Sequence, residues 1–139
     1  MVQGVVGMLR QMITIKGQAN HAGTTPMDMR QDALVAAAQV ILAVKQIALS
    51  MPSQPVATVG YLTVAPNAVN IVPGQVELSV DMRDLSQDCL DTMMSRLLRE
   101  LNQIAADTST EIDVTPVLCV QPTPAAPLVQ KRLNLSPKS

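Results

Sequence analysis

The sequence predicts an α+β fold, a ferredoxin-like βαββαβ two-layer sandwich with a four-stranded antiparallel sheet and two helices on one face. Two observations predict it. Short segments alternate apolar and polar residues as half-buried strands do, and two longer segments repeat apolar residues at helical spacing. The 139-residue length allows one core, so we expect one domain over residues 1–120 and a tail over residues 121–139.

The first strand and the first helix are separated by a glycine-rich segment. Residues 12–16 alternate and predict a strand, whereas residues 17–27 contain two glycines and a proline and predict a loop. Residues 30–49 predict a helix. Its apolar residues at helical spacing are Ala33, Ala37, Val40, Val44 and Ile47, and its face is widened by Leu34, Ile41 and Ala48.

Two strands and a turn-rich connection over residues 65–74 follow. Residues 56–64 predict a strand that places one set of side chains on a common face: Val56, Thr58, Gly60, Leu62 and Val64. The next strand alternates an apolar set, Val76, Leu78, Val80 and Met82, with a polar set, Glu77, Ser79, Asp81 and Arg83. Because Met82 must face the helices, we expect Arg83 on the uncovered face of the sheet.

The second helix is predicted to begin at an N-cap, Ser86, with Asp88 in its first turn. Its apolar stripe is Leu90, Met94, Leu97, Leu101 and Ile104. Residues 111–118 predict the last strand. Residues 121–139 are proline-rich and offer no face to bury, so we expect a flexible tail.

Composition excludes several classes of protein. A net charge of -1 and a pI near 5.7 leave no basic surface for nucleic acid. The longest apolar run, residues 33–44, is too short to cross a bilayer, and residues 1–10 show no signal-peptide pattern. We therefore expect a cytoplasmic protein without membrane contact. Its 47% hydrophobic and 15% charged residues suggest that part of its surface is covered by a partner.

Metal binding and disulfide formation are not expected within this chain. Cys89 and Cys119 lie far apart in the sequence, and the simplest interpretation is two reduced thiols. His21 is the only histidine, so no familiar zinc-ligand set can be assembled from histidine and cysteine. The isolated chain should bind no stoichiometric zinc or manganese.

Four ordered motifs carry a family resemblance. Residues 17–33, Gly-Gln-Ala-Asn-His-Ala-Gly-Thr-Thr-Pro-Met-Asp-Met-Arg-Gln-Asp-Ala, closely resemble the lid-domain signature of the amidase, hydantoinase/carbamoylase family of zinc exopeptidase-like metallohydrolases. This is the N-carbamoyl-L-amino acid hydrolase and allantoate amidohydrolase type. Residues 57–60, 67–74 and 81–84 match in the expected order. The resemblance extends roughly over residues 4–120.

The resemblance implies a lid that pairs with a second lid to form a homodimer. It also implies a catalytic domain, absent from this sequence, that holds two divalent metal ions, Zn²⁺ or Mn²⁺. His21 resembles the lid histidine that reaches an active site across the dimer and stabilises the oxyanion of the transition state. Asn70 and Arg83 resemble the groups that hold the substrate carboxylate, for which a guanidinium is well shaped.

Each of these residues also has a purely structural interpretation. A lone histidine in a glycine-rich loop is usually a solvated or capping side chain. Arg83 could pair with Asp81 or Glu77, and Asn70 could be only a turn residue. The sequence leaves these interpretations open.

Three functional hypotheses remain. The first is a dimerisation and substrate-binding lid of a metal-dependent amidohydrolase acting on N-carbamoyl-L-amino acids or allantoate-like ureido acids, inactive when isolated. The second is a free-standing ferredoxin-like module that binds a small carboxylate through Asn70 and Arg83. The third is one half of a split amidohydrolase, completed by a separately encoded catalytic chain.

Overall fold

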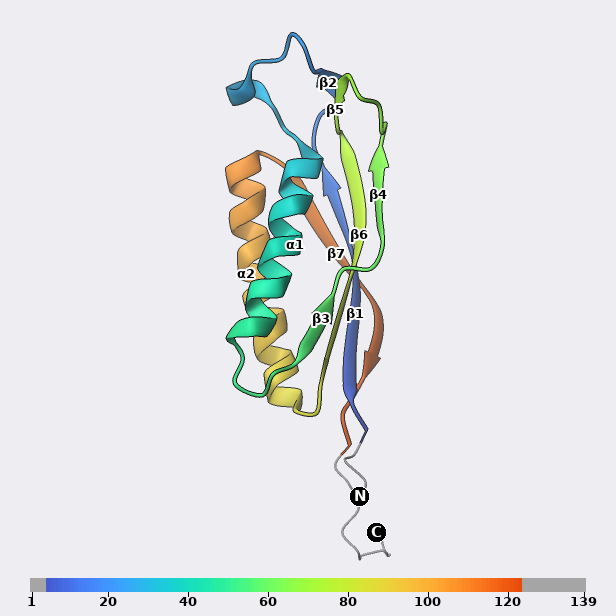
Figure 1. Ribbon diagram of the computed structural model, residues 1–139, viewed down its shortest axis with the longest axis vertical. Helices are drawn as coiled ribbons and strands as arrows, with labels where there is room; N and C mark the ends of the chain where they lie inside the picture. The colour runs from blue at the N-terminus through green and yellow to red at the C-terminus, as the bar shows by residue number, and fades with distance from the viewer. Residues whose placement is uncertain (1–4, 124–139) are drawn as a thin grey trace, which may run out of the picture.

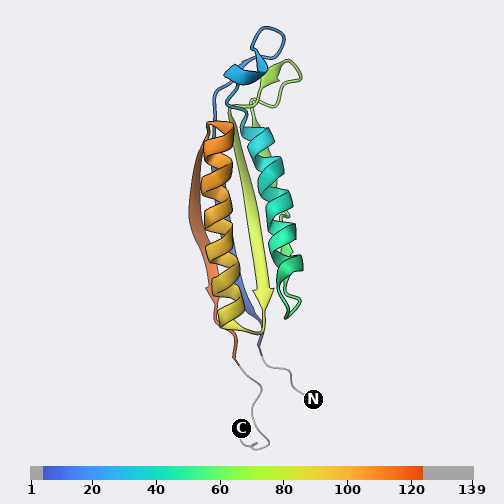
Figure 2. The same cartoon turned by 90° about the vertical axis from the view of Figure 1, so that its left-hand side faces the viewer.

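The protein folds as an α+β two-layer sandwich, as the sequence predicted. The structure is a computed structural model and describes residues 5–123. One layer is an antiparallel sheet, and the other consists of α1 (Ala33–Ser50) and α2 (Gln87–Thr108), which lie side by side on the same face of the sheet (Figures 1 and 2). The opposite face of the sheet carries no helix in the described part of the chain.

The main sheet has the order β3-β6-β1-β7, and β4 also pairs with β6. The strands span Gly7–Lys16 in β1, Val56–Thr58 in β3, Leu62–Ala65 in β4, Gln75–Asp84 in β6 and Glu111–Val120 in β7. The two long strands β1 and β6 therefore lie at the centre, while β3, β4 and β7 form the edges. The ferredoxin-like assignment of this order stays a prediction.

β1 begins five residues earlier than the sequence predicted. The reason is Gln11, a polar residue at a position that faces the helices, where the alternation calls for an apolar one. Gln11 is only 6% exposed, and its Oε1 has no hydrogen-bond partner among the described residues. β7 is also longer than the sequence predicted, because it extends past residue 118 to Val120.

The predicted strand over residues 56–64 is wrong in one respect, because it is interrupted by a bulge. Thr58 pairs with Asp81 and Leu62 pairs with Leu78, so four steps along the edge oppose three steps along β6. Directly opposed residues share a face of the sheet. Thr58 therefore faces the open side, whereas Leu62 faces the helices, and the expected common face of Val56 to Val64 does not exist.

α1 begins at Ala33 rather than at residue 30. Asp32 caps it, accepting hydrogen bonds from the backbone N–H groups of Leu34 (3.0 Å) and Val35 (3.1 Å). The segment just before the cap forms a short 3₁₀ helix, Met27–Met29. The expected core stripe of α1 is confirmed, and its buried residues are Ala33, Ala36, Ala37, Val40, Val44 and Ile47.

α2 is capped as predicted, because the Ser86 hydroxyl accepts from the Cys89 N–H at 3.2 Å and Asp88 lies in the first turn. Its stripe is confirmed except at one position: Met93 is fully buried, and Met94 is only partly buried at the margin of the core. The hydrophobic core lies between the helices and the inner face of β1 and β6. Its largest fully buried side chains are Ile13, Ile15, Leu78, Met82, Leu90, Met93 and Leu97.

By length and composition alone, α1 could cross a membrane, since its 18 residues have a mean hydropathy of 1.8. In the structure 39% of this helix is buried within the sandwich. A core helix of a globular domain has the same composition. The packing against the sheet therefore accounts for part of its apolar character, and the rest lies on an exposed surface.

A second, two-stranded sheet lies at one end of the molecule (Figure 1). β2 (Asn20–His21) pairs with β5 (Ile71–Val72), so both segments predicted as loops contain a short strand. At the other end, Thr123 pairs with Val5. The rest of the predicted flexible tail, residues 124–139, lies outside the described residues.

Candidate functional site

His21 and Asn70 are brought together by the small sheet. His21 is opposite Ile71, and the Ala22 N–H donates to the Asn70 carbonyl oxygen at 2.9 Å. Both side chains are exposed. The two segments that carry them are 49 positions apart in the sequence, and only backbone pairing, which the sequence did not predict, places them side by side.

The His21 ring is oriented by its own loop. The Gly23 N–H donates to His21 Nδ1 at 3.0 Å. A neutral imidazole with an accepting Nδ1 carries its proton on Nε2, which is then a hydrogen-bond donor. That is the tautomer required of a group that donates to a developing oxyanion.

Arg30 holds the same loop by hydrogen bonds to its backbone. Its Nη2 donates to the Ala22 carbonyl at 2.7 Å, and its Nε donates to the Thr25 carbonyl at 3.1 Å. The Thr25 hydroxyl in turn donates to the His21 carbonyl at 2.7 Å. Sequence reasoning missed this role of Arg30, and the only available signal was its place in the family motif.

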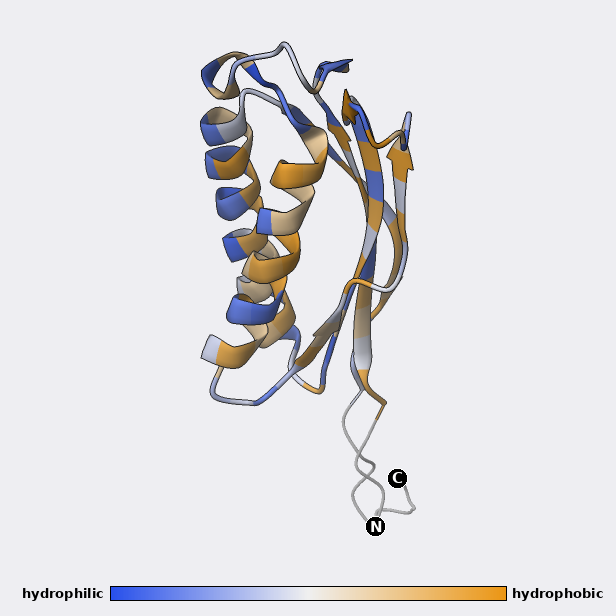
Figure 3. Ribbon diagram, turned by 45° about the horizontal axis from the view of Figure 1, so that its top comes forward, coloured by the Kyte–Doolittle hydropathy of each residue, from blue (hydrophilic) through white to orange (hydrophobic). Residues whose placement is uncertain are grey.

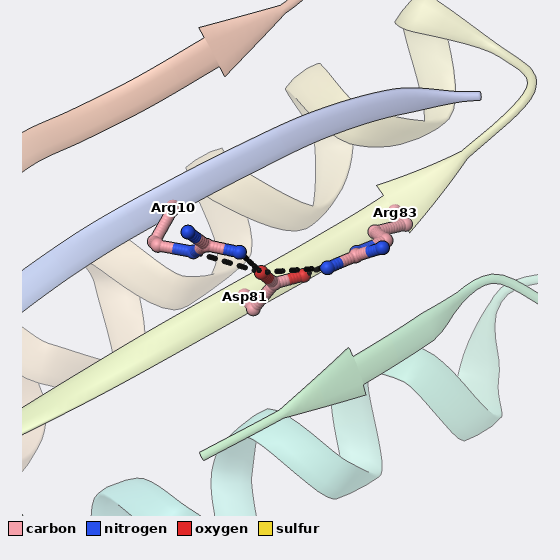
Figure 4. A network of polar contacts seen from close by, with 3 residues as sticks. All are labelled: Arg10, Asp81 and Arg83. Carbon is pink, nitrogen blue, oxygen red and sulfur yellow. Dashed lines mark hydrogen bonds and ion pairs between the residues drawn. The ribbon is translucent and has the colours of Figure 1, made fainter. Parts of the chain in front are cut away.

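Arg83 lies on the open face of the sheet, as predicted, and takes part in a network with Asp81 and Arg10 (Figure 4). Arg83 Nε donates to Asp81 Oδ1 at 2.8 Å and its Nη2 to Oδ2 at 3.4 Å. Arg10 Nε and Nη2 donate to Asp81 Oδ2 at 3.0 and 2.8 Å. The pairing of Arg83 with Asp81 agrees with the structural interpretation of Arg83, whereas the sequence gives no indication that Arg10 takes part.

The network holds two guanidinium groups against one carboxylate, which leaves one unit of positive charge. The Arg83 hydrogen bond, and then Arg10, lower the pKa of Asp81 despite the opposing effect of partial burial. The Asp81 carboxylate raises the pKa of Arg83 in turn. The Asp81 carboxylate and the Arg83 guanidinium are therefore charged at neutral pH. All three residues of the network line a shallow groove of about 510 Å³, together with Val56, Thr58, Gly60, Tyr61 and Ser79.

Tyr61 reaches this groove because of the bulge between β3 and β4. Its carbonyl accepts from the Ser79 N–H at 3.1 Å, so it is opposite a residue of the open face. Tyr61 is the only aromatic residue in the chain, and no pattern in the sequence indicates its place in this groove.

One chain does not bring all three predicted residues together. The small sheet with His21 and Asn70 adjoins the start of β6, whereas Arg83 lies near its end (Figure 1). The eight steps of β6 between Gln75 and Arg83 span about 26 Å at roughly 3.3 Å per residue. Asn70 and Arg83 of the same chain therefore cannot contact the same small carboxylate.

The metal ions implied by the family resemblance do not fit the residues present. Within residues 5–123, no group of three or more histidine, cysteine, aspartate or glutamate side chains is placed to hold a metal ion.

The two cysteines are free, as expected. Cys89 is buried, and desolvation raises the pKa of its thiol, which makes it a poor nucleophile. The Ser53 hydroxyl lies 3.1 Å from its sulfur and 3.2 Å from Asp84 Oδ2. This cluster joins the start of α2 to the end of β6 and is structural.

The α+β sandwich described above is that of a known domain class, and the chain belongs to the peptidase dimerisation domain family, which it matches over residues 4–109. Among curated proteins, it is 36% identical over 126 residues to the N-carbamoyl-L-amino-acid amidohydrolase of Paenarthrobacter aurescens, covering 91% of this chain and 31% of that protein. It is 29% identical over 123 residues to the allantoate amidohydrolase of Bacillus subtilis, covering 88% of this chain and 30% of that protein.

Among solved structures, an amidase of the hydantoinase/carbamoylase family from Burkholderia multivorans superposes with a TM-score of 0.87 at 35% identity. The match covers 90% of this chain and 30% of that one. The chain thus spans about a third of the length of the curated relatives that it matches. The family resemblance noted in the sequence is confirmed.

Proposed function

We propose that this chain is the dimerisation and substrate-carboxylate-binding lid of a metal-dependent amidohydrolase that hydrolyses linear amide or ureido C–N bonds. The names of the relatives support N-carbamoyl-L-amino acids or allantoate-like ureido acids as substrates. Catalysis would require the remainder of such an enzyme. The observation that carries the proposal is an exposed apolar surface, made of one face of α1 and the adjoining sheet edge, on a domain of a dimerisation family.

This dimer surface is defined by one side of α1 and by β4. On the side of α1 away from α2, three exposed apolar residues, Leu34, Ala38 and Ile41, recur at helical spacing, and Lys45 lies at the end of this row. Leu34 is 38% and Ile41 37% exposed. α1 packs over β3 and β6, so this side adjoins the β4 edge, where Leu62 is also exposed. In Figure 3 the outer turns of α2 are largely hydrophilic, whereas α1 is hydrophobic over most of its length.

The opposite edge of the sheet is less suited to pairing. β7 contains Pro116, which has no backbone N–H, and its register with β1 shifts between Arg10 and Gln11. Proline and bulges are the usual devices that prevent edge strands from pairing with another chain. β4 has neither within its four residues, so a second copy of this chain would pair there and bring the two α1 helices together.

The proposed dimer would also account for the distance between Asn70 and Arg83 within one chain. Because Asn70 and Arg83 lie at opposite ends of one lid, we propose that they contribute to different active sites of the dimer. The accepting Nδ1 of His21 supports its proposed role, since Nε2 is then left to donate to an oxyanion across the interface.

Light scattering of the purified chain tests the dimer surface. At micromolar concentration we expect twice the 14.8 kDa chain mass, held by an interface of at least about 1,000 Å². Ile41→Glu should yield the monomer, because a charge would be buried at the centre of the interface. Leu42→Glu is the matched control: Leu42 is 64% exposed but lines the groove beside α2, so this variant should remain dimeric. A monomeric wild-type chain, or equal behaviour of the two variants, contradicts the proposal.

A further inference from the structure

We propose that Asp81 and Arg10 are positioning residues for Arg83, which hold its guanidinium by one edge and leave the other edge to a carboxylate ligand. The inference rests on the carboxylate-binding role proposed above and deepens it. It assigns a function to Arg10 and Asp81, whose side chains need not contact the ligand.

The geometry of Arg83 carries the first step. A guanidinium offers two edges for bidentate binding, one formed by Nε and Nη2 and one by Nη1 and Nη2. Asp81 occupies the Nε/Nη2 edge of Arg83, at 2.8 and 3.4 Å. Within residues 5–123 no other acceptor bonds to Arg83, so the terminal Nη1/Nη2 edge is the one that a ligand carboxylate can bind.

Charge explains why Arg10 is needed. Arg83 and Asp81 alone would form a neutral ion pair with little attraction for an anion. Arg10 donates twice to the same carboxylate, which restores a net positive charge and shares the carboxylate between two cations. The lowered pKa of Asp81 is consistent with a carboxylate that stays ionised between them.

The strand framework makes the arrangement rigid. Arg10 is directly opposite Asp81 in the antiparallel pair of β1 and β6, and Arg83 lies two residues further along β6, on the same face. Both are long central strands of the sheet. The Asp81 side chain is 18% exposed, against 40% for Arg10 and 44% for Arg83, so the carboxylate is shielded beneath the two cations.

The competing interpretation is a purely electrostatic anion site, in which Asp81 and Arg83 form an ordinary surface ion pair and Asp81 does not position Arg83 for the ligand. Asp81→Asn separates the two. It adds a unit of positive charge to the site, so a purely electrostatic anion site would bind more tightly. A site that depends on positioning should bind more weakly, because asparagine offers Arg83 one neutral oxygen in place of the two oxygens of a carboxylate.

The test is an NMR titration of the full 139-residue chain with N-carbamoylglycine, against sodium chloride at matched ionic strength. The Arg83 Nε–Hε resonance reports both ligand binding and side-chain order. We expect saturable shifts in the wild type, and a dissociation constant raised by roughly tenfold or more, or binding lost, in Asp81→Asn and Arg10→Gln. Asp81→Asn should also make the Arg83 side chain mobile without ligand.

Lys16→Gln is the matched control for Arg10→Gln. It removes the same charge from the same strand and face, about 20 Å away, where Lys16 pairs with Asp113 at 3.5 Å. Its affinity should equal that of the wild type. Equal or tighter binding by Asp81→Asn overturns the positioning role and leaves carboxylate binding by Arg83 intact. A wild-type chain whose Arg83 resonance ignores N-carbamoylglycine overturns the carboxylate-binding role as well, without bearing on the dimer.

Discussion

Replacing Gly17 by alanine should destabilise the chain and displace the loop that carries His21. Gly17 lies where β1 ends, against the backbone that precedes α1. A Cβ atom added there would lie 2.0 Å from the Gln31 carbonyl oxygen and 3.2 Å from the Ala33 N. The obstructing atoms belong to the backbone, so no side-chain rotation relieves the clash.

The loss of stability in Gly17→Ala follows from the backbone hydrogen bonds that the added Cβ disrupts. Real Cβ atoms come no closer than about 3.0 Å to a carbonyl oxygen, whereas this one would lie at 2.0 Å. The segments around residues 17 and 31 must therefore move apart by about 1.0 Å. That movement disrupts the bond from Gln18 N–H to the Gln31 carbonyl (2.9 Å) and strains the one from Gly17 N–H to the Gly74 carbonyl (2.8 Å). Two backbone hydrogen bonds at about 1 kcal/mol each give a loss of about 2 kcal/mol. For a domain of this size, Tm should fall by roughly 8 °C.

Urea unfolding and thermal melts measure this loss, and Gly60→Ala is the control. A Cβ at Gly60 would meet only Thr58 Cγ2, at 3.9 Å, which is an ordinary contact. That variant should be as stable as the wild type or more stable by about 0.4–1 kcal/mol. If Gly17→Ala unfolds at the same urea concentration as Gly60→Ala, the close approach of residues 17 and 31 is not what holds this loop.

Two further predictions concern single carboxylates. The pKa of Asp81 is lowered in the folded chain, so its stabilising contribution is present above about pH 4 and lost as pH falls through the lowered value; the stability difference between wild type and Asp81→Asn in urea should therefore be larger at pH 6 than at pH 3, and a constant difference contradicts the ion-pair network. Asp32→Ala should lower the free energy of unfolding by about 1 kcal/mol through loss of the α1 cap, whereas Asp28→Ala, a nearby carboxylate outside the cap, should leave it unchanged.

The sequence predicted those features that depend on an uninterrupted local pattern. The strict alternation of β6 was sufficient to place Arg83 on the open face, and Ser86 was sufficient to locate the start of α2. The pattern failed at Gln11, because a buried polar side chain looks like the end of a strand. The early start of β1 was missed for that reason, and Arg10 with it.

The long-range parts of the site were beyond local patterns. Nothing in the sequence around Asn20 or Ile71 indicates that two-residue strands will pair, since so short a strand has no periodicity. The family motifs nevertheless selected His21 and Asn70, which the pairing places together. Their assigned roles stay predictions, because they depend on a partner lid and a catalytic domain.

The bulge between β3 and β4 has a consequence for the proposed pairing of two chains. Deleting Gly60 would leave the pairing of Thr58 with Asp81 and of Leu62 with Leu78 intact while removing the surplus residue, and the edge would become one straight strand from residue 56 to residue 65. A long, flat and apolar edge is a template for open-ended aggregation. With the bulge in place, only the four residues of β4 are available, and they can be used up by a single twofold contact. In the proposed dimer, the extra residue would therefore confine strand pairing to one closed contact and oppose open-ended assembly.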